Sequence, residues 1–164
     1  KSIDKNLSKA ESTKGPGFFT SLVIYGFTVR RVHRFRRMLR LRDQGITILA
    51  DRFPQISMPS AIDGPGFGKV GRNRGIGKYL AKLEWRQFEW MTSHCPDLVV
   101  RLIVDLETAI ARKPDHAPER LAPKIAEIPQ LTFGGARIVD IDATQPIDQV
   151  IAAAKAAIAP VLKR

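Results

Sequence analysis

The sequence predicts a three-layer α/β protein in which helices cover both faces of a parallel sheet. Short apolar, β-branched runs at residues 46–50, 97–104 and 136–141 are typical of buried strands, and segments with helical spacing alternate with them. Strands that alternate with helices form parallel sheets, because each parallel connection needs a crossover. The length of 164 residues and a hydrophobic fraction of 44% predict one domain with a sizeable core.

The amino-terminal part of the chain is expected to form a polar arm and a long helix. Residues 1–17 are polar and close with a Gly-Pro-Gly turn, which indicates a loop or mobile arm. From residue 18 to about residue 43 apolar residues recur at helical spacing, and Gly45 is a natural stop for this helix. We expect residues 18–164 to form the α/β domain.

The elements after the first helix follow from the same patterns. The continuous apolar run 46–50 predicts a strand that is buried on both faces. Glycine and proline are frequent in residues 54–78, which predicts a long loop. The remaining expected elements are a helix at about 77–93, a strand at 97–104, helices at 106–112 and 117–128, a strand at 136–141 and a last helix from Pro146 to about Leu162.

Composition excludes several classes of protein. The hydrophobic fraction of 44% and the charged fraction of 26% exclude a wholly disordered or fibrous chain. Cys95 is the single cysteine, which excludes an internal disulfide framework and a cysteine-rich zinc module and fits a reducing cytoplasm. The apolar stretch at residues 18–29 is too short to cross a bilayer, so we expect no membrane span.

The basic residues are concentrated near the amino terminus. The formal net charge is +11, and residues 1–44 hold 11 basic and 3 acidic residues. An anionic partner is therefore expected near this part of the chain. The arginines of the segment Arg30–Arg40 fit a face that binds nucleic acid or an anionic membrane, and they also fit a solvated face with buried side-chain stems.

Asp51 and Arg52 directly follow the predicted strand 46–50. Ligands bind beyond the carboxyl ends of the strands in open parallel sheets. A carboxylate there can hold hydrated Mg²⁺ or accept a proton, and a guanidinium fork suits a phosphate. The pair therefore predicts phosphoryl transfer, with a surface ion pair at a strand end as the alternative.

A glycine-rich stretch offers a second candidate phosphate site. Residues 66–71 have the Gly-x-Gly-x-x-Gly spacing of dinucleotide-binding loops. No predicted strand leads into the stretch and no helix begins at its end, so a flexible loop is the favoured interpretation. Arg72 and Arg74 beside it can still meet a phosphate.

Arg112 and Lys113 lie at the end of the predicted helix 106–112. Cations at a helix carboxyl end are favoured by its dipole, which explains them without any function. The functional interpretation is a lid over residues 112–120 that brings positive charge to a transferring phosphoryl group.

Five segments together carry a resemblance to a known family. They are residues 46–55 (a strand followed by Asp-Arg-Phe-Pro-Gln), 63–65 (Asp-Gly-Pro), 96–105, 111–115 and 139–146. Their order and spacing resemble the thymidylate kinase-like branch of the P-loop nucleoside monophosphate kinases, in which tyrosine stands in place of Phe53. The resemblance covers about residues 46–162.

The resemblance implies a P-loop NTPase-like fold that transfers phosphate from ATP, with Mg²⁺, to a thymidylate-like nucleoside monophosphate or a related small acceptor. Asp51 would lie near Mg²⁺ and the acceptor phosphate, and Arg52 would bind that phosphate. The roles implied are catalytic for Asp51, Arg52 and Arg112, substrate-binding for Arg52, Gln55, Arg72 and Arg74, and nucleotide-binding for Arg112, Lys113, Ala143 and Gln145.

The sequence departs from the family at its amino-terminal end. The family begins with a strand and a glycine-rich loop ending in Gly-Lys-Ser/Thr, which holds the ATP phosphates, and this chain has neither. We therefore expect these residues to be the acceptor and lid portion of a longer kinase, inactive or very weak alone. Exposed strand edges beside the missing strand would favour association with an amino-terminal segment or between copies of the chain. A basic module acting through Arg30–Arg40 and a degenerate kinase-like scaffold are the alternatives.

Overall fold

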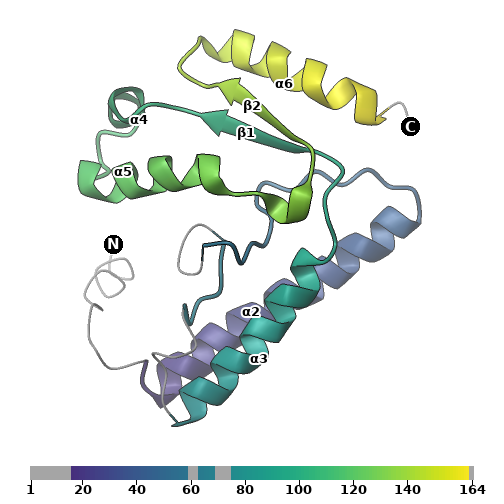
Figure 1. Cartoon of the computed structure of the whole chain (residues 1–164), viewed down its shortest axis with the longest axis vertical. Helices are drawn as coiled ribbons and strands as arrows, with labels where there is room; N and C mark the ends of the chain where they lie inside the picture. The colour runs from purple at the N-terminus through teal and green to yellow at the C-terminus, as the bar shows by residue number, and fades with distance from the viewer. Residues whose placement is uncertain (1–15, 59–62, 69–74, 163–164) are drawn as a thin grey trace.

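The structure is a computed structural model that describes residues 16–58, 63–68 and 75–162, apart from the side chain of Arg120. Two long helices form one part of the molecule, and two strands with three further helices form the other (Figure 1). In chain order the elements are α2 (Phe18–Asp43), α3 (Gly75–Thr92), β1 (Val99–Ile103), α4 (Leu106–Arg112), α5 (Pro118–Glu127), the 3₁₀ turns η2 (Ile128–Gln130) and η3 (Phe133–Gly135), β2 (Ile138–Asp142) and α6 (Ile147–Leu162).

Helices α2 and α3 lie side by side and run in the same direction (Figure 1). Thr28 meets Glu84 near the first half of both helices, and Phe35 contacts Trp90 further along both. Because the helices are parallel, the chain between them must return along the length of the pair. We call its described residues, 46–58 and 63–68, the return segment.

The core of the helix pair consists of two apolar clusters. Val32, Phe35, Phe88 and Met91 form one cluster, against which Phe53 of the return segment also packs. Phe67, Leu80 and Ala81 form the other, with Ile24 and Tyr25 beside them. Both clusters therefore join the return segment to the helices, and burial of these side chains fixes where the segment lies.

The carboxyl end of α2 confirms the predicted helix stop at Gly45. Gly45 has a φ of +80°, a conformation that glycine adopts without a Cβ clash. Its N–H donates to the carbonyl of Arg42 at 2.8 Å, and the N–H of Ile46 donates to the carbonyl of Leu41 at 3.1 Å. These two bonds make a Schellman motif, which turns the chain sharply into the return segment.

The sheet pairs β1 with β2 in parallel, from Val99 opposite Ile138 to Ile103 opposite Asp142. The connection between them runs through α4 and α5, while α6 packs against β2 (Figure 1). Arg101 and Asp140 are paired in register and form a bidentate ion pair, with Nε–Oδ1 at 2.6 Å and Nη2–Oδ2 at 2.7 Å. Arg101 Nη1 also donates to backbone carbonyls near η2, so it links the sheet to the turn after α5.

The predicted strand at 46–50 is not found. Residues 46–50 have no strand pairing within the described part of the chain, and Leu49 is 90% exposed rather than buried. A strand needs a neighbouring backbone for its N–H and C=O groups, and no described segment supplies one. The mixed helix and strand composition and the parallel sheet are confirmed, and the sheet of the described residues has two strands. The three-layer, P-loop NTPase-like arrangement stays a prediction. Among the described helices, none has the length and hydrophobicity to cross a lipid bilayer.

Candidate anion-binding cleft

A cleft of about 950 Å³ lies between α2 and the return segment. Its lining comes from one flank of α2, from residues 48–50, 52–54, 63, 64 and 66 of the return segment, and from Glu84 and Phe88 of α3. Aromatic and aliphatic side chains make up much of the lining. The cleft is large enough for a small-molecule ligand.

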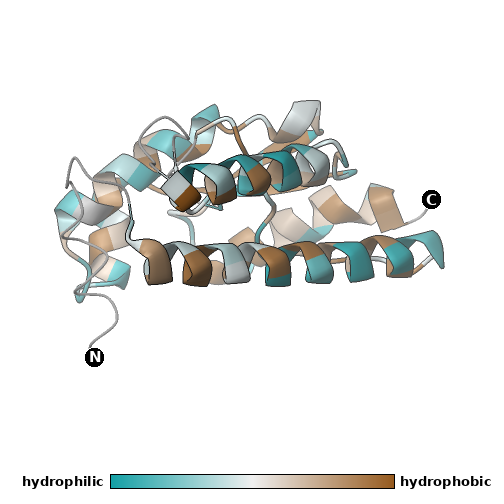
Figure 2. Ribbon diagram, turned by 90° about the horizontal axis from the view of Figure 1, so that it is seen from below, coloured by the Kyte–Doolittle hydropathy of each residue, from teal (hydrophilic) through white to brown (hydrophobic). Residues whose placement is uncertain are grey.

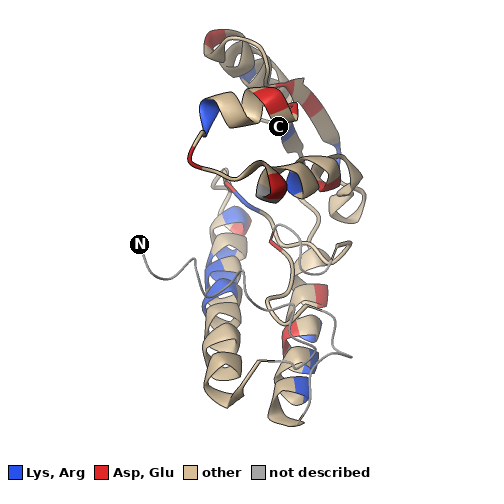
Figure 3. Cartoon of the chain, turned by 90° about the vertical axis from the view of Figure 1, so that its left-hand side faces the viewer, with Lys and Arg blue, Asp and Glu red and all other residues tan. Residues whose placement is uncertain are grey.

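Four arginines line this cleft. Arg30, Arg31 and Arg34 project from α2, and Arg52 comes from the return segment opposite. Figure 3 shows that the basic residues of α2 gather toward its carboxyl end; the first of them is Arg30, and residues 18–29 carry none. The sequence between residues 30 and 43 contains seven arginines and one aspartate, so little negative charge within the helix offsets them. Such a concentration favours an anionic ligand.

Asp63 holds two of these arginines at the mouth of the cleft. Its carboxylate, on a side chain only 10% exposed, lies 3.6 Å from Arg52 Nη1 and 3.9 Å from Arg31 Nη2. Its backbone carbonyl accepts a hydrogen bond from Arg31 Nη1 at 3.1 Å. Asp63 also has a φ of +61°, a region that non-glycine residues rarely occupy outside turns. The turn thus brings together two guanidinium groups from distant parts of the chain.

Glu84 fastens the return segment to the helix pair. It is 1% exposed, and its carboxylate accepts hydrogen bonds from the Thr28 hydroxyl at 2.6 Å, the Gly66 N–H at 3.0 Å and the Phe67 N–H at 2.9 Å. A Cβ on Gly66 would lie 2.9 Å from the Ile24 side chain, so the chain passes too close for any larger residue. These contacts fix the turn that carries Asp63.

The structure separates the predicted pair Asp51 and Arg52. Arg52 lines the cleft with a side chain 70% exposed, whereas the Asp51 side chain is fully exposed and is not part of the lining. Their shortest charged contact, Arg52 Nε to Asp51 Oδ2, is 3.9 Å. The expectation that both side chains face one hollow at a strand end is therefore wrong for Asp51, because no sheet orients the residues before it. The contact fits the alternative interpretation, a surface ion pair.

The other predicted substrate contacts lie elsewhere or outside the described residues. Gln55 is buried, and its amide group bonds both backbone groups of Met58, donating at 3.0 Å and accepting at 2.9 Å. It closes a turn of the return segment and does not line the cleft. Arg72 and Arg74 lie outside the described residues, as do residues 69–71 of the glycine-rich stretch.

The predicted nucleotide residues Arg112, Ala143 and Gln145 come together at the carboxyl ends of the strands. Arg112, the last residue of α4, donates to the carbonyls of Ala143, Thr144 and Gln145 in the turn between β2 and α6. The guanidinium group therefore joins the segment 112–120 to this turn. Lys113 follows as the exposed C-cap of α4, and the segment up to residue 119 is exposed throughout.

Asp142 organises the same turn. It accepts hydrogen bonds from the Thr144 hydroxyl at 2.6 Å, the Thr144 N–H at 2.9 Å and the Gln145 side-chain amide at 2.8 Å. The bond from the Thr144 hydroxyl, followed by that from Gln145, lowers the pKa of Asp142 below its ordinary value. A smaller cavity of about 340 Å³ is lined by residues of β2, including Asp142, by residues of α6 and by Gln145 of the turn.

Metal binding by protein side chains alone is not indicated. The described residues contain no group of three or more histidine, cysteine, aspartate or glutamate side chains placed to hold a metal ion. Asp51 offers one exposed carboxylate, and Mg²⁺ commonly takes one or two carboxylates together with substrate phosphates and water. Asp51 does not line the cleft, so a role for it in binding Mg²⁺ stays a prediction.

Sequence reasoning missed the two carboxylates that organise the cleft. In the sequence Asp63 stands out only as part of an Asp-Gly-Pro turn, and its partners lie elsewhere in the chain. Glu84 had a usable signal, since it occupies the apolar face of α3 between Leu80 and Phe88, which are four residues away on either side. A charged residue on a buried helix face needs partners, so the pattern indicates a buried carboxylate with hydrogen-bond donors around it.

Two sets of curated proteins are similar to the chain. The Escherichia coli K12 protein named "uncharacterized ATP-binding protein YghS" is 42% identical over 144 residues, which are 87% of this chain and 61% of the relative. The protein named "uncharacterized ATP-binding protein YghR", from E. coli K12 and from E. coli O6:H1 strain CFT073, is 36% identical over 154 residues, which are 92% of this chain and 61% of the relative. The chain thus spans about three-fifths of the length of these relatives. No protein-family model matches the chain, and no solved structure matches it significantly.

Proposed function

We propose that the chain is the acceptor-binding and lid portion of an ATP-dependent phosphotransferase whose acceptor is a nucleoside monophosphate or a related small phosphorylated molecule. The observation that carries the proposal is the cleft, in which Arg52 and Arg31 are held together by Asp63. A guanidinium group can bind phosphate through two parallel hydrogen bonds, and two such groups side by side can bind one phosphate together. A cytoplasmic location, expected from the single cysteine, belongs to the same proposal.

The ATP side of the proposal rests on a second place in the fold. The relatives YghS and YghR carry ATP binding in their names. Arg112 and the turn at Ala143–Gln145 lie together beside the exposed segment 112–120. We place the adenine end of ATP at this turn, with Arg112 and Lys113 acting from the lid. Asp51 would contribute its carboxylate to a Mg²⁺ ion held mainly by the nucleotide phosphates, and the ion would stabilise charge on the transferring group.

The chain's own residues would perform two tasks in such a reaction. Arg52 and Arg31 would orient the acceptor and neutralise its phosphate, which otherwise repels the incoming phosphoryl group. The aromatic and aliphatic lining of the cleft would exclude water from that region and contact the organic part of the acceptor. The phosphates of ATP are held in such kinases by a glycine-rich loop that ends in Gly-Lys-Ser/Thr, a motif that residues 1–164 do not contain.

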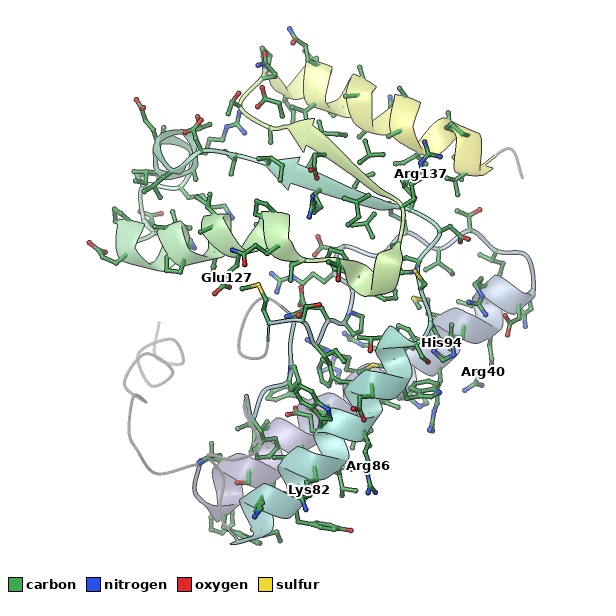
Figure 4. All side chains as sticks on the ribbon, in the orientation of Figure 1. Arg40, Lys82, Arg86, His94, Glu127 and Arg137 are labelled. Atoms are coloured by element: carbon green, nitrogen blue, oxygen red, sulfur yellow. The ribbon has the colours of Figure 1, made fainter. Side chains whose placement is uncertain are left out.

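The test is calorimetric titration of thymidine monophosphate and of ATP into the chain and into the longer protein. Arg52→Gln should weaken monophosphate binding by about tenfold or more, because one charge-assisted contact contributes about 1.5–3 kcal/mol. Arg40→Gln is the matched control, since Arg40 lies on the same helix and points away from the return segment (Figure 4). Unchanged monophosphate affinity in Arg52→Gln would remove the assignment. Arg112→Gln tests the ATP side, where it should weaken ATP binding and leave monophosphate binding unchanged.

A basic binding module is the second candidate function. It is favoured by the seven arginines and single aspartate between residues 30 and 43. Nucleic-acid binding through this face would fall steeply with salt, and joint replacement of Arg30, Arg34 and Arg37 would abolish it. Absence of duplex binding at low salt would end this alternative.

A further inference from the structure

The four arginines of the cleft divide into two pairs by their contacts. Arg31 and Arg52 both reach Asp63. Arg30 and Arg34 make no hydrogen bond or ion pair with any residue in the part of the chain that the structure describes. They are four residues apart on α2, so their side chains are neighbours on one face of the helix. The cleft thus contains a second pair of guanidinium groups that have no partner among the described residues.

The charges of the lining leave room for more than one anion. The lining holds four arginines and two carboxylates, those of Asp63 and Glu84, which gives a formal charge of +2. Glu84 is already bonded to the Thr28 hydroxyl and to two backbone amides, so it does not reach the arginines. Of the two lining carboxylates, only that of Asp63 faces the guanidinium groups.

The ion pairs of Asp63 leave guanidinium N–H groups available to a phosphate. Its carboxylate lies 3.6 Å from Arg52 Nη1 and 3.9 Å from Arg31 Nη2, which is too far for a hydrogen bond. Ion pairs of this length with an exposed partner are weak, and the Arg52 side chain is 70% exposed. The N–H groups of Arg52 and of Arg31 Nη2 make no hydrogen bond to Asp63, so they can bind one phosphoryl group, while Arg30 and Arg34 remain available for another.

We propose that the acceptor carries two phosphoryl groups, one bound by Arg31 and Arg52 and the other by Arg30 and Arg34. This rests on the proposed function, in which the cleft is the acceptor site, and it narrows the acceptor from a nucleoside monophosphate or related molecule to a related molecule with two phosphoryl groups. The ligand class is a diphosphate or bisphosphate of a small organic molecule, whose body lies against apolar side chains such as Phe27 and Phe53. A cleft of about 950 Å³ has the volume for both charged groups and this body.

The test compares inorganic phosphate and pyrophosphate as probes, by calorimetry at constant ionic strength. The wild-type chain should bind pyrophosphate at least about tenfold more tightly than phosphate. Arg34→Gln should remove about tenfold or more of the pyrophosphate affinity and change the phosphate affinity less than about twofold. Arg52→Gln should weaken both probes, and Arg40→Gln should weaken neither.

Each alternative result has a distinct meaning. The inference of a second phosphoryl group is overturned if the wild-type chain binds phosphate and pyrophosphate equally tightly, or if Arg34→Gln binds both as the wild type does. The proposed function still stands in that case if Arg52→Gln loses phosphate binding. Equal losses in Arg34→Gln and Arg40→Gln also overturn it, because they indicate diffuse charge attraction. Unchanged phosphate affinity in Arg52→Gln overturns the proposed function together with the inference. Arg34→Lys, which keeps the charge without the planar fork, should restore only part of the pyrophosphate affinity.

Discussion

Replacing Glu84 by glutamine tests whether this buried carboxylate holds the return segment in place. The change keeps the size of the side chain but replaces one oxygen with an NH₂ group. Oε1 accepts from Thr28 and from the Gly66 N–H, and Oε2 accepts from the Phe67 N–H. In Glu84→Gln the new NH₂ group must therefore face a donor, so at least one of these bonds is lost and one donor is left unpaired.

The expected loss of unfolding free energy in Glu84→Gln follows from the burial and the charge of the Glu84 side chain. A hydrogen bond to a charged group contributes about 1.5–3 kcal/mol, and an unpaired buried N–H costs about 1–3 kcal/mol. Glu84 is 1% exposed, so water does not replace the lost partner. The neutral amide is easier to bury than a carboxylate, which offsets part of the loss. We expect the free energy of unfolding to fall by about 2–4 kcal/mol, and the midpoint of thermal unfolding by about 5–15 °C.

The assay is urea unfolding followed by tryptophan fluorescence, because Trp85 and Trp90 both lie on α3. The matched control is Glu89→Gln on the same helix, where the exposed carboxylate accepts only from Trp85 Nε1 at 2.8 Å among the described side chains. The control should change stability by less than about 1 kcal/mol. Glu84→Gln with a stability within about 0.5 kcal/mol of wild type would refute the role of Glu84 as the fastening point.

Three further predictions concern the backbone and the ion pair of the sheet. Gly66→Ala should destabilise the chain by about 1–3 kcal/mol in urea unfolding, because its Cβ would lie 2.9 Å from the Ile24 side chain; an unchanged midpoint would contradict the close approach. Gly26→Ala should stabilise it by about 1 kcal/mol in the same assay, since nothing described lies within 4 Å of the added Cβ and alanine favours helix; a loss of stability would contradict this. The side-chain hydrogen bond from Arg101 lowers the pKa of Asp140, so its contribution is present above the unfolded pKa of about 3.9 and is lost as pH falls below it. Urea unfolding between about pH 6 and about pH 3 should therefore show a weaker decline in Asp140→Asn than in wild type, and identical profiles would contradict the prediction.

Sequence patterns predicted the elements whose signals are local. The long helix from residue 18 to 43 coincides with α2, and its end at Gly45 has the expected left-handed conformation. The predicted helix 106–112 likewise coincides with α4. Apolar spacing, helix caps and glycine stops depend on residues that are close together in the chain, so one sequence is enough to predict the helices that they define.

Features that depend on distant partners were not predictable in the same way. The run at 46–50 has the composition of a strand, yet a strand exists only where another backbone pairs with it, and composition does not report that partner. The position of Arg31 beside Asp63 joins residues 32 apart, through a turn whose location depends on Glu84 further along the chain. The sequence could indicate that arginines gather near residues 30–40, but not which of them share a cleft.

The lining of the cleft comes from α2, from α3 and from two stretches of the return segment. Figure 2 shows the two long helices from below. Because these parts come together only in the folded chain, the melting temperature reports whether a ligand is bound in the cleft. A molecule bound by Arg31 and Arg52 contacts segments of the chain that separate on unfolding, so it binds only the native state. At a concentration of about one hundred times its dissociation constant, such a compound adds about 2.7 kcal/mol to the native state. A panel of metabolites scored by dye-based melting would rank candidate occupants without any knowledge of the reaction, and the Arg52→Gln protein would separate true occupants from compounds bound elsewhere.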